Sequence, residues 1–248
     1  KAAALPPVPE AWDFDLDVTG NTLPVPMFLN DLYGCCVIAS RGHATIRFEY
    51  AEQKLVLPIT DAEILAEYTG EGGSLNPNNG GLVMLDSMKQ WRNDGWAAAG
   101  KQYKIHSFLE IGRDRTIEEV KVAIRHLNGC MVGVALPDNW QQQLDAGEVW
   151  HIASGPGAQP NPNSGHAMYV VGYNKDGPIF LTWGQRQPAS WQWFEAVTAN
   201  AIQGEIYAVA DGRNSLDSPV DPAKLDAVLA QLGTLPPVEI KKHWWNDS

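Results

Sequence analysis

Cys36 is the first residue in this sequence whose position suggests chemistry. It lies where a turn that ends at Gly34 enters a predicted helix. The first backbone N–H groups of a helix lack partners within the helix and carry partial positive charge. They would stabilise a thiolate, lower the pKa of the Cys36 thiol and make it a nucleophile near neutral pH. An isolated cysteine is more often a small buried hydrophobe, so a nucleophilic role also requires a base.

A candidate base, His166, follows Cys36 by 130 residues. His166 opens an apolar run, so a predicted strand would hold its ring at the end that can face a helix terminus. A lone histidine at a strand end more often bonds to backbone. An imidazole beside a thiol, however, is a standard means of activating cysteine, and the pair together predicts nucleophilic chemistry.

The composition of the chain limits the other possibilities. It has 248 residues, ten tryptophans, a formal charge of −11 and a pI near 4.9. The aromatic content excludes disorder, and the acidic balance argues against nucleic acid or an anionic membrane as a partner. The sequence contains no run of eighteen apolar residues, so no membrane span is predicted. It also lacks an apolar stretch after Lys1, so no signal peptide is predicted. The compartment and the oligomeric state are left open.

The remaining thiols do not indicate a disulfide framework. The chain has only three cysteines, Cys35, Cys36 and Cys130, and three cannot all pair. Cys130 precedes an apolar strand and is expected in the core. The sequence offers no role for Cys35.

Helices are predicted in the first half of the chain. Thr60 with Glu63, and Thr116 with Glu119, have the spacing of capping boxes. Apolar residues recur at helical spacing in the other two segments. The four predicted helices span residues 36–53, 60–70, 82–94 and 116–127.

Strands are predicted in the second half, as short apolar runs over residues 131–136, 167–173, 179–183 and 205–210. Helices followed by strands predict an α+β fold, with a helical lobe against a mainly antiparallel sheet lobe. The boundary between the lobes is expected near residues 115–130, within one domain of residues 1–211. Residues 212–248 are expected to form an extension with a short helix from Asp221 and a tryptophan-rich tail.

Five short segments, taken together and in this order along the chain, are more specific than any one of them: PEAWDF (9–14), NDLYGCCVIAS (30–40), NNGG (78–81), GHAMYVVGY (165–173) and LTWG (181–184). Together they resemble papain-like cysteine peptidases, and the likeness spans residues 6–211. The separation of Cys36 and His166 also lies within the roughly 130–150 residues found in papain-type enzymes. The phrase NDxYGxC with a later TWG resembles uncharacterised papain-like proteins of bacteria and phages.

The resemblance implies a papain-like two-lobed fold, with Cys36 on a helix of the helical lobe and His166 in the antiparallel sheet lobe. It implies cysteine-dependent hydrolysis of an amide bond in a peptide or protein, with neither metal nor cofactor. Cys36 takes the position of the nucleophile, His166 that of the base and Asn30 that of the oxyanion donor. The residues implied to line the substrate cleft are Asn79, Gly80, Gly81, Gly165 and Trp183.

The sequence departs from the family pattern at the third catalytic position. Leu181 stands where the family has the asparagine that orients the histidine. The neighbouring Thr182 could instead accept the Nδ1 proton of His166, and so could a backbone carbonyl or water. Asn30 replaces a glutamine and is shorter by one methylene. Tyr33 stands at the position of a disulfide cysteine, and Val37 at that of a tryptophan.

These departures leave two alternatives to a peptidase. One is a papain fold that no longer hydrolyses peptides and acts as a binding or structural module. The other is an acyltransferase of the transglutaminase type, which retains the Cys–His pair. His43 is excluded as the base because seven residues of helix place it roughly 10 Å from Cys36.

Overall fold

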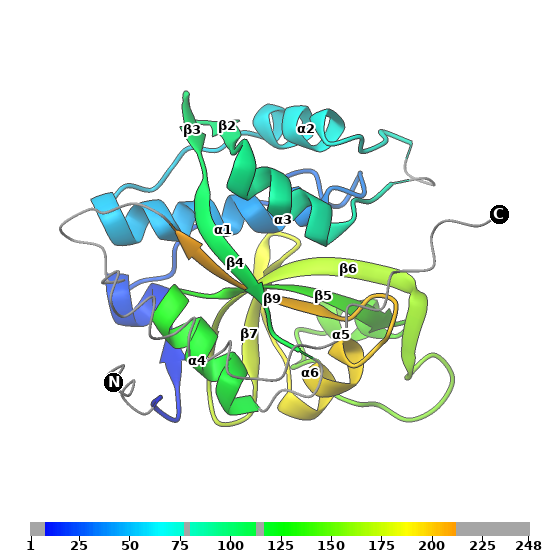
Figure 1. The fold of residues 1–248 in the computed structure, drawn as a ribbon. Helices are drawn as coiled ribbons and strands as arrows, with labels where there is room; N and C mark the ends of the chain where they lie inside the picture. The colour runs from blue at the N-terminus through cyan, green and yellow to red at the C-terminus, as the bar shows by residue number, and fades with distance from the viewer. Residues whose placement is uncertain (1–7, 77–79, 113–116, 212–248) are drawn as a thin grey trace.

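The computed structural model describes residues 8–76, 80–112 and 117–211. Helices from the first half of the chain lie on one side of the molecule, and an antiparallel sheet with further helices lies on the other (Figure 1). The helical lobe comprises α1 (Cys36–Gln53), α2 (Asp61–Gly70), α3 (Met84–Asn93) and a hairpin of β2 (Trp96–Ala98) and β3 (Lys101–Tyr103). The predicted α+β fold with two lobes is confirmed.

The second lobe is built on a seven-stranded sheet in which every described pairing of strands is antiparallel. Its main path runs through β4 (Ile105–Glu110), β9 (Glu205–Asp211), β5 (Cys130–Pro137), β6 (Pro160–Tyr173), β7 (Pro178–Thr182) and β8 (Gln185–Pro188). The short β1 (Trp12–Asp13) pairs with β6. The helices of this lobe are α4 (Ile117–Leu127), α5 (Trp140–Asp145) and α6 (Trp191–Thr198).

The central elements are buried on all sides, which explains their sequences. Every residue of β5 and the last eight of β6 are buried, so these strands appear as continuous apolar runs rather than as alternating patterns. Helix α1 is also buried along most of its length and packs against β6. Its sequence therefore has no clear polar face.

Helix α2 begins at the capping box that the sequence predicts. The Thr60 hydroxyl accepts from the Glu63 N–H at 3.3 Å, and the Glu63 carboxylate accepts from the Thr60 N–H at 2.8 Å. The helix is tied to α1 by the buried Arg41, which pairs with Glu67 at 2.7 Å and with Glu71 at 2.5 Å. Thr116, the predicted cap of α4, lies outside the described residues, and so does the predicted extension 212–248.

A buried carboxylate joins the N-terminal segment to both lobes. Asp15, which begins a π-helical turn at Asp15–Thr19, has no exposed surface. It accepts hydrogen bonds from Arg47 of α1 at 2.9 and 3.1 Å and from Arg186 of β8 at 2.7 Å. Arg186 also pairs with Asp13. The network therefore connects α1 to the β7–β8 hairpin.

The structure also contains elements that the sequence did not predict. Strand β6 begins at Pro160, seven residues before the predicted start, because its first six residues are exposed or half-buried and form no apolar run. Helix α6 has an aromatic-rich sequence that does not favour helix, yet Ser190 caps it by accepting from the Trp193 N–H at 3.1 Å. Strand β4 and helix α5 were not predicted either, and both are short.

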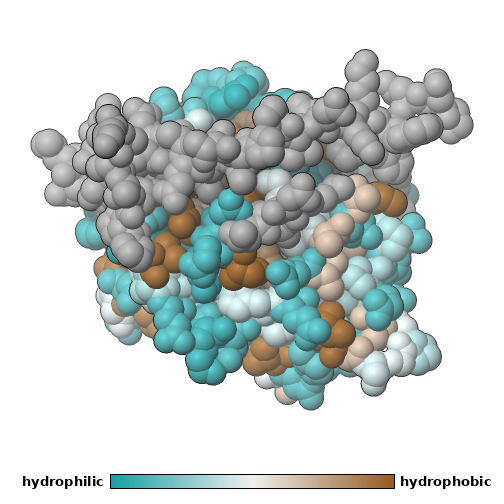
Figure 2. Space-filling model, turned by 60° about the horizontal axis from the view of Figure 1, so that its bottom comes forward, coloured by the Kyte–Doolittle hydropathy of each residue, from teal (hydrophilic) through white to brown (hydrophobic). Residues whose placement is uncertain are grey.

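On the face shown in Figure 2, hydrophobic side chains appear as separate spots among hydrophilic ones. The large hydrophobic side chains that are exposed come from separate segments of the described chain: Leu16, Met27, Leu32, Leu55, Val56, Leu75, Val83, Val149 and Ile202. Among the helices of the described ranges, none combines the length and the apolar character needed to cross a bilayer.

Candidate active site

Cys36 is the first residue of α1, and Cys35 immediately precedes the helix. All three cysteines are free thiols. Cys35 and Cys130 are fully buried, whereas Cys36 is only partly so. Cys36 is therefore the thiol that a reagent or substrate can reach.

The turn before Cys36 lies directly against the glycine pair Gly80–Gly81. A Cβ atom at Gly34 would lie 2.6 Å from the Gly81 nitrogen, so a side chain there would drive the two segments apart. The Gly81 N–H donates to the Tyr68 hydroxyl at 3.0 Å, which donates to the Ser74 carbonyl at 3.0 Å. These contacts bring the predicted cleft residues Gly80 and Gly81 beside the start of α1. The third predicted residue of that loop, Asn79, lies outside the described residues.

The edge of β6 runs along the first turn of α1. The backbone N–H of Ala167 acts on the Cys36 sulfur and favours its thiolate, and the Ala167 carbonyl accepts from the Ser40 hydroxyl at 3.0 Å. Cys36 and Ser40 are four residues apart and lie on one face of the helix. His166 is the residue before Ala167, so its backbone lies one residue from these contacts. Sequence reasoning did not identify Ser40 as this anchor.

The imidazole of His166 is held from two sides. Its Nε2 lies 2.8 Å from the Thr182 hydroxyl oxygen. One face of the ring stacks on Trp183, with centroids 4.0 Å apart and planes 8° from parallel. The sequence offers Thr182 as one of three possible acceptors of the Nδ1 proton, but the Thr182 hydroxyl lies at Nε2 instead.

A second tryptophan extends this stack. Trp140 of α5 lies 4.1 Å from Trp183 on centroids, with the planes 16° from parallel. Trp150 meets Trp183 edge-on at 6.4 Å. Sequence reasoning missed Trp140 because α5 was not predicted and no spacing in the sequence connects it to Trp183. The stack limits the directions in which His166 can turn.

A tight hairpin presents Thr182 and Trp183. Thr182 pairs with Gln185, so Trp183 and Gly184 form a two-residue turn between β7 and β8. Their φ angles are 43° and 73°, the pattern of a type I′ turn. Glycine adopts such angles freely, but for a bulky residue like Trp183 they are strained. Strain of this kind persists where the surroundings hold it and is concentrated at functional sites.

Asn30 lies next to the same hairpin. The indole N–H of Trp183 donates to the backbone carbonyl of Asn30 at 3.3 Å, and the Asn30 N–H donates to the Met27 carbonyl at 3.1 Å. The loop that carries Asn30 is therefore attached to the residue that stacks on His166.

Gly165 lies beneath a side chain that the sequence did not indicate. A Cβ atom there would lie 2.2 Å from the Gln203 amide oxygen, and Gln203 also donates to the Pro162 carbonyl at 3.0 Å. The Gln203 amide thus lies against one side of Gly165, which is itself exposed.

Burial opposes charge on both members of the pair. It raises the pKa of the Cys36 thiol above its usual value, although the N–H groups of Ala167, Val37 and Cys36 act in the opposite direction. Burial also lowers the pKa of His166 to about 3. The expectation that the helix terminus lowers the pKa of Cys36 is wrong for this structure, because desolvation of the thiolate outweighs the helix amides. The resting pair is a neutral thiol and a neutral imidazole.

This ionisation predicts how alkylation of Cys36 depends on pH. Only the thiolate reacts, and a raised pKa keeps the thiol protonated at neutral pH, so the rate with iodoacetamide should climb by up to about tenfold per pH unit between about pH 6 and pH 9. Mass spectrometry of a Cys35→Ser variant assigns the label to Cys36, with Cys36→Ala as the blank. A rate that is already high at about pH 6 and constant above it would instead indicate a preformed ion pair.

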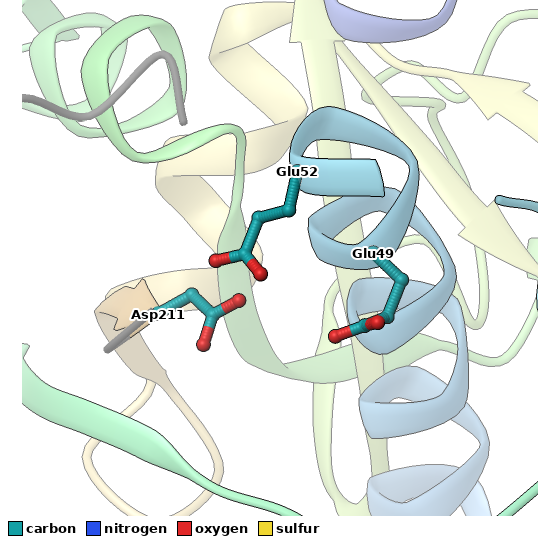
Figure 3. A group of neighbouring side chains, drawn as sticks. All are labelled: Glu49, Glu52 and Asp211. Atoms are coloured by element: carbon teal, nitrogen blue, oxygen red, sulfur yellow. The ribbon is translucent and has the colours of Figure 1, made fainter. Parts of the chain in front are cut away.

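A separate group of carboxylates lies far from this pair. Glu49 and Glu52 of α1 and Asp211 at the end of β9 point toward one another (Figure 3), and their oxygens lie within 4.8 Å of one another. Glu49 follows Cys36 by thirteen residues of helix, or about 20 Å. The cluster is the one group of metal-ligand type found in the described ranges, and it is not part of the Cys36 site.

Neither a protein-family model nor a curated protein matches the sequence. Solved structures do match the fold. A cysteine protease of Carica candamarcensis in complex with E-64 has a TM-score of 0.59 at 15% identity, over 83% of this chain and 100% of that one. Xylellain, a cysteine protease from Xylella fastidiosa, has a TM-score of 0.58 at 14% identity, over 85% and 91%. The bromelain protease of Ananas comosus with E64 has a TM-score of 0.55 at 11% identity, over 83% and 100%.

These neighbours are named as cysteine proteases, and at such identities they establish the fold alone. They do not distinguish a bacterial or phage branch, so that resemblance stays a prediction. With Cys36 at the start of a buried helix and His166 on the facing strand, the chain has the two-lobed α+β fold of papain-like cysteine proteases.

Proposed function

We propose that this protein is a cysteine-dependent amide hydrolase that cleaves peptides. One observation carries the proposal. The residue after His166 contacts the Cys36 thiol, while the His166 ring is fixed between Thr182 and Trp183. This arrangement supports the sequence of nucleophile, base and orienting group that nucleophilic catalysis requires, with Cys36, His166 and Thr182 in these proposed roles.

In the proposed reaction, the Cys36 sulfur attacks the scissile carbonyl and its proton passes to His166. His166 returns that proton to the leaving amine as the C–N bond breaks, which leaves an acyl group on Cys36. Water, deprotonated by His166, then releases the carboxylic acid and restores the thiol. Because the resting pair is neutral, the proton moves during the attack rather than before it.

Thr182 can hold His166 in the tautomer that this reaction requires. When its hydroxyl oxygen accepts the proton on Nε2, the Nδ1 of His166 retains a lone pair and is the atom that can take the proton of Cys36. The ring stack with Trp183 holds this orientation and keeps water away from one face. Thr182 thus performs the orienting role for which the resemblance offers only Leu181.

The oxyanion would be stabilised by the Asn30 side chain and the Cys36 N–H, a pair of donors of the kind that acyl-transfer enzymes use. An extended peptide would bind by backbone hydrogen bonds along Gly80 and Gly81 and across Gly165. Asn79 and Trp183 complete this proposed substrate site. No metal or organic cofactor takes part in these steps.

Two observations favour a second candidate. Burial raises the pKa of Cys36, and a hydroxyl rather than an amide lies behind His166. Both features suit a papain fold that binds peptides without cleaving them. A transglutaminase-type reaction would use the same acyl-enzyme with an amine in place of water.

A peptide library incubated with the protein separates these candidates. We expect new peptide termini, detected by mass spectrometry, with the wild-type protein and with Cys130→Ala, but not with Cys36→Ala. Added primary amine that is incorporated into products would indicate acyl transfer. If no peptide is cleaved and no acyl group is found on Cys36, the hydrolase proposal is wrong and the binding module remains.

A further inference from the structure

We propose that Cys35 is a positioning residue, whose thiol anchors the loop that carries Asn30. This inference rests on the proposed function, because it concerns how the oxyanion donor is held. It also provides an account of Cys35 beside the nucleophile.

The loop before α1 is held in an uncommon conformation. Phe28 and Leu29 have φ angles of 56° and 54°, in the left-handed region that side chains other than glycine seldom adopt. Asn30 follows directly. Two successive residues in this region persist only when their surroundings hold them, and any relaxation would move Asn30.

The aromatic ring of Phe28 is one restraint on the loop. A Cβ atom at Gly42 would lie 2.8 Å from the Phe28 ring, so the ring packs directly on the α1 backbone. The ring also lies 5.2 Å from that of His43. These contacts fix the side chain of Phe28 but leave its carbonyl unconstrained.

Hydrogen bonds hold four successive carbonyls of the loop. Met27 accepts from the Asn30 N–H, Leu29 from two N–H groups further along the loop, and Asn30 from the Trp183 indole. The remaining carbonyl, that of Phe28, accepts from the Cys35 thiol at 3.4 Å. In the part of the chain that the structure describes, the Cys35 thiol is the donor to the Phe28 carbonyl oxygen, and Phe28 is 1% exposed. Removal of the thiol would leave a buried carbonyl unsatisfied, which favours rearrangement of the loop.

The environment keeps the Cys35 thiol a donor. Cys35 has no exposed surface. Burial, together with the neighbouring Cys36, raises its pKa to about 12. Cys35 therefore remains protonated in any ordinary assay and does not compete with Cys36 for substrate.

The test compares Cys35→Ala, which has no donor, with Cys35→Ser, which has a hydroxyl. We expect Cys35→Ala to lower kcat for peptide cleavage by about tenfold, a part of the 10²–10³-fold loss that follows removal of an oxyanion donor. Cys35→Ser should retain most of the activity. KM and the alkylation rate of Cys36 should change little in either variant, because alkylation creates no oxyanion. Hydrogen exchange of residues 27–33 should be faster in Cys35→Ala and near wild type in Cys35→Ser.

The outcomes separate the two proposals. A wild-type protein that does not cleave or become acylated overturns the proposed function, and the catalytic role of Cys35 with it. Cleavage by wild type at a rate matched by Cys35→Ala overturns the role of Cys35 alone. A loss of kcat that is accompanied by an equal loss of alkylation rate would also overturn it, since Cys35 would then act on the nucleophile rather than on Asn30.

Discussion

Replacement of His166 by Gln is expected to lower kcat/KM for peptide cleavage by at least about 10³-fold, within the range attributed to a general base. Glutamine cannot take the proton of the Cys36 thiol, and burial keeps that thiol protonated near neutral pH. Thr182→Val should lower it by a smaller factor, on the order of 10²-fold. Valine has the shape of threonine but cannot hydrogen bond to Nε2, so the ring loses the bond that orients it. Initial rates with a cleaved library peptide measure both effects.

Thr182→Ser is the matched control, because it retains the hydroxyl oxygen that lies 2.8 Å from His166 in the wild-type protein. It should retain activity within a few fold of wild type. Circular dichroism and thermal unfolding establish that each variant is folded, since His166 and Thr182 are both buried. Equal activity of Thr182→Val and wild type would contradict the role of Thr182, and a fully active His166→Gln would contradict the Cys–His mechanism itself.

The parts of the site that sequence could predict are those encoded locally. The start of α1 at Cys36 follows from the turn at Gly34, and the strand of His166 follows from the apolar residues after it. Their separation along the chain indicates only that the fold must bring the helix and the strand together. The contact that does so, between the Ser40 hydroxyl of α1 and the Ala167 backbone of β6, is a tertiary contact with no local signal in the sequence.

The ionisation of Cys36 could not be read from the sequence for the same reason. A helix N-terminus is visible in the sequence, whereas the burial that opposes it arises only when the chain folds and β6 packs against α1. Trp140 is a similar case, because it stacks on Trp183 only after α5 has folded against the β7–β8 hairpin. Both features depend on segments that lie far apart in the chain.

Asp15→Ala is expected to lower the free energy of unfolding by about 3–5 kcal/mol, the usual cost of removing one partner from a buried ion pair. The Asp15 carboxylate accepts from Arg47 and Arg186 and also from the Leu23 N–H at 3.1 Å. Asp15 and Arg47 are fully buried, and Arg186 is 20% exposed at its side chain. Without Asp15, the buried charge of Arg47 would have no counterion in this network. Chemical denaturation monitored by tryptophan fluorescence measures the change.

Asp176→Ala is the matched control, because Asp176 pairs with Lys175 at 2.8 Å but both side chains are more than 60% exposed. Its effect should be within about 0.5 kcal/mol of zero. A loss below about 1 kcal/mol for Asp15→Ala would mean that Arg47 finds another partner or reaches water.

Because Arg47 belongs to the Cys36 helix and Arg186 to the hairpin of Thr182 and Trp183, Asp15 joins the two elements that carry the site. Asp15→Asn keeps the shape of the side chain but weakens this bridge, so it should lower kcat/KM at temperatures where the variant is still folded.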